Sequence, residues 1–133
     1  MTLPVLLYKF ILRMENLSIK ASKNTPQIEF SKEGKLAITG SAYPENAKEF
    51  FDPIIEWVTG LRIEKIDLDM NLEYINTAAA KKILELLKTL EANMRIGLFR
   101  VRWHYEKGDE DGLETGQILD ESLKRIKFDY VEV

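Results

Sequence analysis

The sequence predicts a single α/β domain built on a mixed, partly parallel sheet with helices mainly on one face. After an opening hairpin, segments with an apolar period of two alternate with segments of helical period, which gives the order β-β-β-α-β-α-β-α-β. Two of the strands also carry opposite charges on their polar faces, as neighbours on an exposed sheet face do. A length of 133 residues fits one domain.

Composition excludes several classes of function. Cysteine is absent, so disulfides, thiol catalysis and cysteine-ligated metals are excluded, and a cytoplasmic protein is favoured. The single histidine removes most zinc sites. A net charge of −3 argues against binding to nucleic acid, whose partners are normally clearly basic. The 45% of hydrophobic residues suffice for a core, and 31% of charged residues predict a soluble surface.

The first thirteen residues differ from the rest, and we treat residues 1–13 as an N-terminal extension ahead of a domain at 14–133. Leu3 to Leu12 is apolar apart from Lys9, but it is too short to span a bilayer and lacks the features of a signal peptide. No membrane insertion is expected. Three interpretations stay open: an upstream start codon ahead of a true start at Met14, an extra packed segment, or a membrane-touching tail. The first is favoured because the organised sequence begins at Met14.

Short strands are predicted first, where apolar residues alternate at 17–21, 28–30 and 36–38. A helix follows, with Asn46 as its candidate N-cap and an apolar stripe that ends at Thr59-Gly60. Pro53 lies inside this stripe and removes one helical amide. A kink is predicted there rather than two helices, because the stripe continues past it.

The central strand and helix follow. From Ile66 to Glu73 apolar and polar residues alternate strictly, which predicts a strand buried on one face. The alternation stops at residues 74–77, and a helical period then runs to Met94. Thr77 therefore lies at the strand-to-helix junction, followed by three alanines that are too small to cover it.

Residues 96–105 alternate again and predict another strand. If this strand lies beside the central one, Asp67 and Asp69 face Arg100 and Arg102 across the exposed face of the sheet. An acidic loop at residues 106–112, a weaker helix carrying Leu113 to Leu123 and a last strand around 126–130 complete the chain.

The remaining polar groups form no recognisable active site. His104 alternates with two arginines and has no nucleophile in a motif with it, which favours a solvated residue. The acidic run 109–111 lacks the spacing of a calcium loop. Asp67 and Asp69 have no pocket-forming loop beside them, which favours salt bridges on the sheet surface. No catalytic residue, metal or cofactor is predicted. A small enzyme that uses Asp67, Asp69 or His104 stays open as a rival interpretation.

Thr77 has two interpretations from the residues alone. As a helix N-cap, its oxygen accepts a hydrogen bond from the amide of Ala79 or Ala80, which is worth about 1 kcal/mol. As a phosphoacceptor, it places the phosphate against free helix amides at the positive end of the helix dipole, with Lys81 one turn away. Periodicity alone favours the cap.

Two motifs bring a known family into view: Tyr-Pro-Glu-Asn at residues 43–46 and Leu-Glu-Tyr-Ile-Asn-Thr at 72–77. Together with the Met-Glu-Asn-Leu at 14–17, the Thr-Pro at 25–26 and the Pro-x-x-x-Trp at 53–57, they make the chain resemble the SiaC family of regulatory phosphoproteins. The resemblance runs from Met14 to the C-terminus.

This resemblance implies a STAS-like fold and a protein that is not an enzyme. Members of the family are phosphorylated by a dedicated serine/threonine kinase and dephosphorylated by a PP2C-type phosphatase. Their unphosphorylated form binds and activates a diguanylate cyclase, which links them to cyclic-di-GMP and biofilm formation. The family's phosphoacceptor threonine matches Thr77. Family members often continue with serines where this chain has alanines at 78–80, so Thr77 is the only hydroxyl of the turn.

We therefore predict a cytoplasmic, non-enzymatic partner-switching regulator controlled by phosphorylation at Thr77. The alternative is a constitutive structural adaptor in which Thr77 is only a helix N-cap. The partner surface is expected around the two motifs, at Tyr43, Pro44, Glu45, Asn46, Tyr74, Asn76, Ala78 and Lys81.

Overall fold

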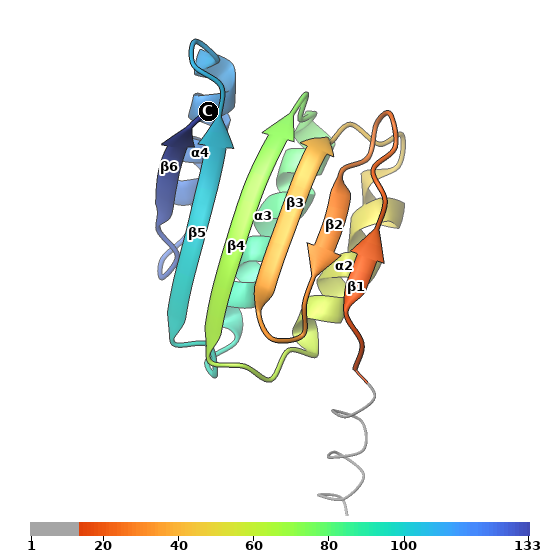
Figure 1. Cartoon of the computed structure of the whole chain (residues 1–133), viewed down its shortest axis with the longest axis vertical. Helices are drawn as coiled ribbons and strands as arrows, with labels where there is room; N and C mark the ends of the chain where they lie inside the picture. The colour runs from red at the N-terminus through yellow and green to blue at the C-terminus, as the bar shows by residue number, and fades with distance from the viewer. Residues whose placement is uncertain (1–13) are drawn as a thin grey trace, which may run out of the picture.

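The computed structural model describes residues 14–133, so the expected N-terminal extension at 1–13 lies outside the described residues. The described part contains one six-stranded sheet and three helices (Figure 1). The strands are β1 (Leu17–Ile19), β2 (Gln27–Phe30), β3 (Lys35–Ser41), β4 (Lys65–Glu73), β5 (Leu98–Tyr105) and β6 (Phe128–Glu132). The helices are α2 (Ala47–Thr59), α3 (Thr77–Ala92) and α4 (Glu110–Glu121). The predicted element order and α/β class are confirmed.

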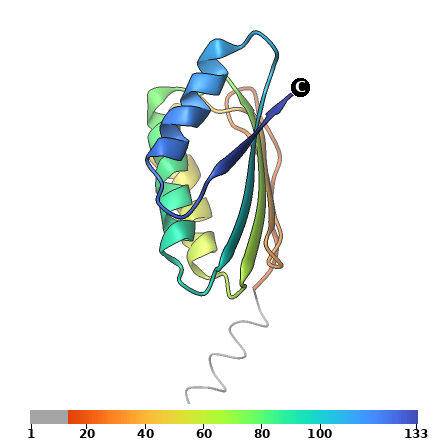
Figure 2. The same cartoon turned by 90° about the vertical axis from the view of Figure 1, so that its left-hand side faces the viewer.

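The strands lie in the sheet in their sequence order, β1 to β6. β1, β2 and β3 pair antiparallel, whereas β3 to β6 pair parallel, with one helix in each crossover. Crossovers that advance in the same direction with the same hand bring their helices to the same face. Figure 2 shows all three helices on one side of the sheet and the other side uncovered. The predicted arrangement of helices on one face is therefore confirmed.

The core lies between the sheet and this helix layer. The helix-facing residues of β4 are fully buried, as strict alternation predicts: Ile66, Leu68 and Met70. The buried stripe of α3 covers them and consists of Ala79, Ile83, Leu86, Leu87 and Leu90. The outward side chains of β4 form part of the uncovered face, where polar residues meet solvent.

One helix agrees with the prediction in detail and another differs from it. α2 continues through Pro53 as one helix, as predicted. α4 begins at Glu110, so residues 110–112 are helical and the predicted acidic loop is too long. The reason is local: the Oδ1 of Asp109 accepts a hydrogen bond from the Gly112 amide at 2.9 Å and caps the helix. The acidic side chains of the first turn also favour the positive end of the helix dipole.

The uncovered face carries a compact ion-pair network. β4 and β5 are neighbours, and Asp69 lies directly opposite Arg102, as predicted. Arg102 makes both ion pairs, from Nε to Asp69 Oδ1 at 2.7 Å and from Nη2 to Asp67 Oδ1 at 2.6 Å. His104 is partly buried, and its Nε2 lies 2.8 Å from Asp69 Oδ1, so the prediction of a solvated histidine is wrong. The cause is the pairing of β4 with β5, which brings Asp69, Arg102 and His104 together on the uncovered face.

Asp69 is expected to contribute to stability only above strongly acidic pH. The Arg102 guanidinium lowers the pKa of Asp69 from 3.8 to about 2. Because the folded pKa lies below the unfolded one, the stabilisation is complete above about pH 4 and is lost as the pH falls towards 2. Solvent screening of this part-exposed pair keeps the gain below about 1 kcal/mol. Urea unfolding at several pH values should therefore show a shallower acid slope for Asp69→Asn than for the unsubstituted protein. An unchanged slope would contradict the network's role.

Candidate functional site at the carboxyl edge of the sheet

The two sequence motifs meet at the edge formed by the carboxyl ends of the parallel strands (Figure 1). The Asn76 amide donates to the Ala42 carbonyl at 3.0 Å, which joins the β4–α3 turn to the β3–α2 loop. The Tyr43 amide donates to the Asn24 carbonyl at 2.9 Å, which adds the β1–β2 loop. These contacts connect the edge from the β1–β2 loop to the turn before Thr77 and bring the two motifs together.

Asn76, not Thr77, caps α3. Asn76 has an extended backbone with φ −83° and ψ 167°, and its Oδ1 accepts a hydrogen bond from the Ala79 amide at 2.8 Å. Its carbonyl accepts from the Ala80 amide at 2.9 Å. The interpretation of Thr77 as the N-cap is therefore wrong, because asparagine has already left the helical conformation and fills that position. Thr77 is the first helical residue, is exposed, and its hydroxyl has no hydrogen-bond partner among residues 14–133.

The surroundings of Thr77 suit an added phosphate. The first turn of α3 contains no acidic residue. The capping interactions occupy the amides of Ala79 and Ala80, which leaves those of Thr77 and Ala78 without a hydrogen-bond partner among residues 14–133, at the positive end of the dipole. Lys81 is exposed one turn further on. The turn can therefore carry a dianion without the loss of any hydrogen bond that holds the fold.

Two substitutions separate the cap from the hydroxyl. Asn76→Ala is expected to destabilise the protein by about 1 kcal/mol, which lowers the melting temperature by about 4 °C. Thr77→Ala removes no hydrogen bond and is expected to change stability by less than about 0.5 kcal/mol. Thermal unfolding followed by circular dichroism measures both. A larger loss for Thr77→Ala than for Asn76→Ala would restore Thr77 as the cap.

A shallow apolar hollow lies beside Thr77. Tyr43, Tyr74, Ile75 and Asn76 line it, and its volume is about 450 Å³. The Tyr74 residue is 74% exposed and has a left-handed backbone with φ 52°, which a residue other than glycine rarely adopts. Exposed aromatic residues are typical anchors of protein interfaces. We call these four residues the tyrosine hollow. Ile75 was not predicted, although an apolar residue where the alternation has stopped is a usable signal.

A second, more polar depression of about 650 Å³ lies between the Tyr74–Ile75 turn and the start of α4. Its lining includes the carboxylates of Glu73, Glu106, Asp109 and Asp111, and we call it the acidic trough. Thr77 lines neither the acidic trough nor the tyrosine hollow. A phosphate on Thr77 would therefore lie beside the tyrosine hollow, whose lining residue Asn76 precedes it, and outside the acidic trough.

The other residues of the expected partner surface have different environments. Pro44 is buried in the β3–α2 loop, and its place on the partner surface stays a prediction. Glu45 and Ala78 are exposed. Asn46 is exposed too, and it caps α2 through a 3.0 Å hydrogen bond from the Glu49 amide to its Oδ1. Asn46 and Asn76 thus play the same structural part at the starts of neighbouring helices.

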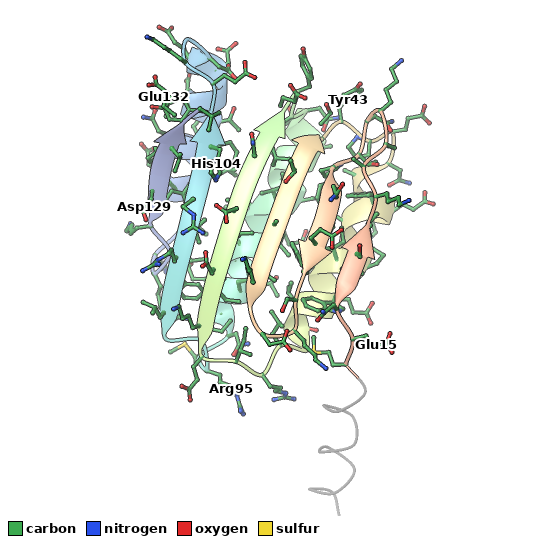
Figure 3. All side chains as sticks on the ribbon, viewed as in Figure 1. Glu15, Tyr43, Arg95, His104, Asp129 and Glu132 are labelled. Atoms are coloured by element: carbon green, nitrogen blue, oxygen red, sulfur yellow. The ribbon has the colours of Figure 1, made fainter. Side chains whose placement is uncertain are left out.

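The polar residues considered for catalysis lie on the uncovered face. Figure 3 shows His104 on this face and Tyr43 at the edge. Asp69 and His104 bind each other, and the Arg102 guanidinium binds Asp69 as well. In the part of the chain that the structure describes, no three histidine, aspartate or glutamate residues gather as a metal site would require. Within that same part, no helix has the length and apolar character needed to cross a membrane.

Comparisons with known proteins converge on one family. Residues 19–133 match the family described as SiaC family regulatory phosphoprotein. An uncharacterized protein of Pseudomonas aeruginosa strain UCBPP-PA14 is 33% identical over 109 residues, which are 78% of this chain and 86% of that protein. The structure of SiaC of Pseudomonas aeruginosa is similar with a TM-score of 0.78 at 28% identity, over 90% of this chain and 100% of that one. The crystal structure of the diguanylate cyclase SiaD in complex with its activator SiaC, from the same organism, gives a TM-score of 0.77 at 29% identity, over 88% and 99%.

Proposed function

Because the chain belongs to the SiaC family of regulatory phosphoproteins, we propose that it is a non-enzymatic regulator whose partner is set by the phosphorylation of Thr77. Without phosphate it binds and activates a diguanylate cyclase, and with phosphate it releases that cyclase. A serine/threonine kinase adds the phosphate, and a PP2C-type phosphatase removes it. We expect the protein to act in the cytoplasm, in cyclic-di-GMP signalling that controls biofilm formation.

The observation that carries this proposal is the exposed hydroxyl of Thr77 at the start of α3, which has no hydrogen-bond partner among residues 14–133. Asn76 holds the cap, so a kinase can reach the hydroxyl and modify it without disturbing the helix. The cyclase as partner is supported by the likeness to a protein that is the activator of the diguanylate cyclase SiaD in their complex.

The phosphate acts on binding through its own hydration. A phosphate carries a charge of about −1.5 to −2 at neutral pH. A partner that covers the tyrosine hollow must approach Thr77, which follows Asn76 directly, and must strip water from that charge. The cost is imposed on the complex and not on the fold, where the helix start compensates the charge. Lys81 is proposed to contact the phosphate in the free protein.

Mapping of phosphorylation in the native host tests the switch. Intact mass and peptide mapping of the protein, purified from several growth conditions, should find a phosphate on Thr77 in part of the population. Incubation with the candidate kinase should raise that fraction, and a PP2C-type phosphatase should lower it. A protein that stays unmodified under all conditions, and with the kinase supplied, would refute the proposal.

Substitution on the uncovered face tests the non-enzymatic assignment. Ala variants of Asp67 and Asp69 should each activate the cyclase as fully as the unsubstituted protein does, and His104 is left out of this test because it also lines the acidic trough. Loss of signalling in a folded variant that still binds the cyclase would favour a small enzyme instead.

A further inference from the structure

Backbone contacts hold the turn that carries Tyr74 in the tyrosine hollow. The hydrogen bond from Asn76 to Ala42 holds the turn on one side, and the pairing of Glu73 with Ser41 holds it on the other. Between these two anchors Tyr74 is kept in the left-handed conformation with its ring exposed. A turn whose backbone is already ordered loses little backbone entropy on binding. The hollow is therefore prepared to receive an apolar side chain of a partner.

The charge on the two sides of this hollow is unequal. On the side of α4 the exposed edge carries six carboxylates and one lysine, at Glu73, Glu106, Lys107, Asp109, Glu110, Asp111 and Glu114. On the side of α2 positive and negative residues are nearly balanced, at Lys20, Lys23, Glu45, Lys48 and Glu49. A partner that matches this edge must be basic on the α4 side only. The edge thus distinguishes two orientations of an otherwise similar apolar contact.

We propose that the diguanylate cyclase docks in a single orientation, with an apolar side chain in the tyrosine hollow and basic side chains over the acidic trough. This inference rests on the proposed function and adds the chemistry of the docking segment. The hollow contributes residence time, because apolar anchors at the centre of an interface slow dissociation. The acidic trough raises the association rate and sets the orientation of the partner, because charges at the rim of an interface mainly alter the association rate.

The acidic trough acts separately from the phosphate. Thr77 is the first residue of α3. The trough lies at the ends of β4 and β5 and at the start of α4, and Thr77 does not line it. Basic side chains over the trough are attracted whether or not Thr77 is modified. Phosphate therefore blocks the contact at the hollow, not the attraction to the trough. Charge reversal in the trough should slow association even in Thr77→Ala, which cannot be phosphorylated.

The test measures association and dissociation rates of the full chain, in the Thr77→Ala background, with the purified cyclase that this variant captures. Glu106→Lys and Asp111→Lys should each slow association about three- to tenfold at 50 mM salt, and the effect should shrink at 300 mM. Glu49→Lys is the matched control for Asp111→Lys, because both residues lie in the first turn of a helix. It should change the rate less than twofold. Tyr74→Ala should accelerate dissociation about tenfold or more.

The outcomes separate the two proposals. If no diguanylate cyclase binds Thr77→Ala, the proposed function fails and this inference falls with it. If the cyclase binds but reversal at Glu106, outside any helix, leaves association unchanged, only the oriented docking is overturned. Equal slowing by Glu49→Lys and Asp111→Lys would also overturn it, because the attraction would then lack direction. Melting temperatures of all variants show whether each one is folded.

Discussion

Phosphorylation of Thr77 is expected to weaken the complex with the cyclase about 100-fold relative to Thr77→Ala, which should bind constitutively. A 100-fold change corresponds to about 2.7 kcal/mol, which is within the range of a single phosphate that must be desolvated at an interface. Thr77→Glu should weaken binding less, about tenfold, because a carboxylate carries less charge than a phosphate. The fold should be unaffected, since Asn76 supplies the cap in every form.

Calorimetric titration of the cyclase with phosphorylated protein, Thr77→Ala and Thr77→Glu measures this difference. Gln117→Glu serves as the control for Thr77→Glu, because it adds the same single negative charge at an exposed position in α4. It should bind like the unphosphorylated protein. Equal affinity of the phosphorylated protein and Thr77→Ala would refute the switch, whereas equal loss for Gln117→Glu and Thr77→Glu would reduce the effect to overall charge.

Local patterns predicted most of this fold because each strand buries one face. The alternation at 66–73 identifies β4 and its buried side without any knowledge of its neighbours. The identity of the cap at α3 was less determinable. Asn76 and Thr77 both suit an N-cap, and the choice depends on which residue keeps an extended backbone after the strand ends. The hydrogen bond from Asn76 to Ala42 in another loop favours that conformation for Asn76.

Features that depend on residues distant in sequence were not predictable. The pairing of two aspartates with two arginines was expected, but side-chain reach brings Arg102 to both carboxylates. The left-handed backbone of Tyr74 requires the turn to be held at both sides. A third example is the contact between α3 and the segment before β6, where Glu91 and Arg125 are 34 residues apart in the chain.

Glu91 and Arg125 hold the segment before β6 against the end of α3. The Glu91 carboxylate accepts hydrogen bonds from the backbone amides of Lys124, Arg125 and Ile126 at 2.8, 2.7 and 3.0 Å. In return, the Arg125 guanidinium donates to the carbonyl of Glu91 in the last turn of the helix and to that of Asn93 just after it. One carboxylate thus satisfies three consecutive amides in a segment that has no helix or strand of its own.

Glu91→Ala is therefore expected to destabilise the protein by about 2–4 kcal/mol at neutral pH, because three amides lose their acceptor together. The corresponding fall in melting temperature is about 10 °C. Burial raises the pKa of Glu91, but the three amide hydrogen bonds outweigh it and hold that pKa below its usual 4.5. Because the folded pKa is the lower one, the contribution is present above about pH 4.5 and is lost as the pH falls. The difference between the variant and the unsubstituted protein should shrink in acid.

Glu85→Ala is the matched control for this measurement, because Glu85 lies on the same helix and pairs only with the Lys82 ammonium, at 3.0 Å, among the described side chains. An exposed pair of this kind contributes less than about 0.5 kcal/mol. Urea unfolding of both variants at pH 7 and pH 4 should separate them clearly at the higher pH and by less at the lower one. If Glu91→Ala and Glu85→Ala have the same free energy of unfolding at pH 7, the segment before β6 does not depend on the Glu91 carboxylate. Its position must then come from the apolar contacts of Ile126 and Phe128 with the core.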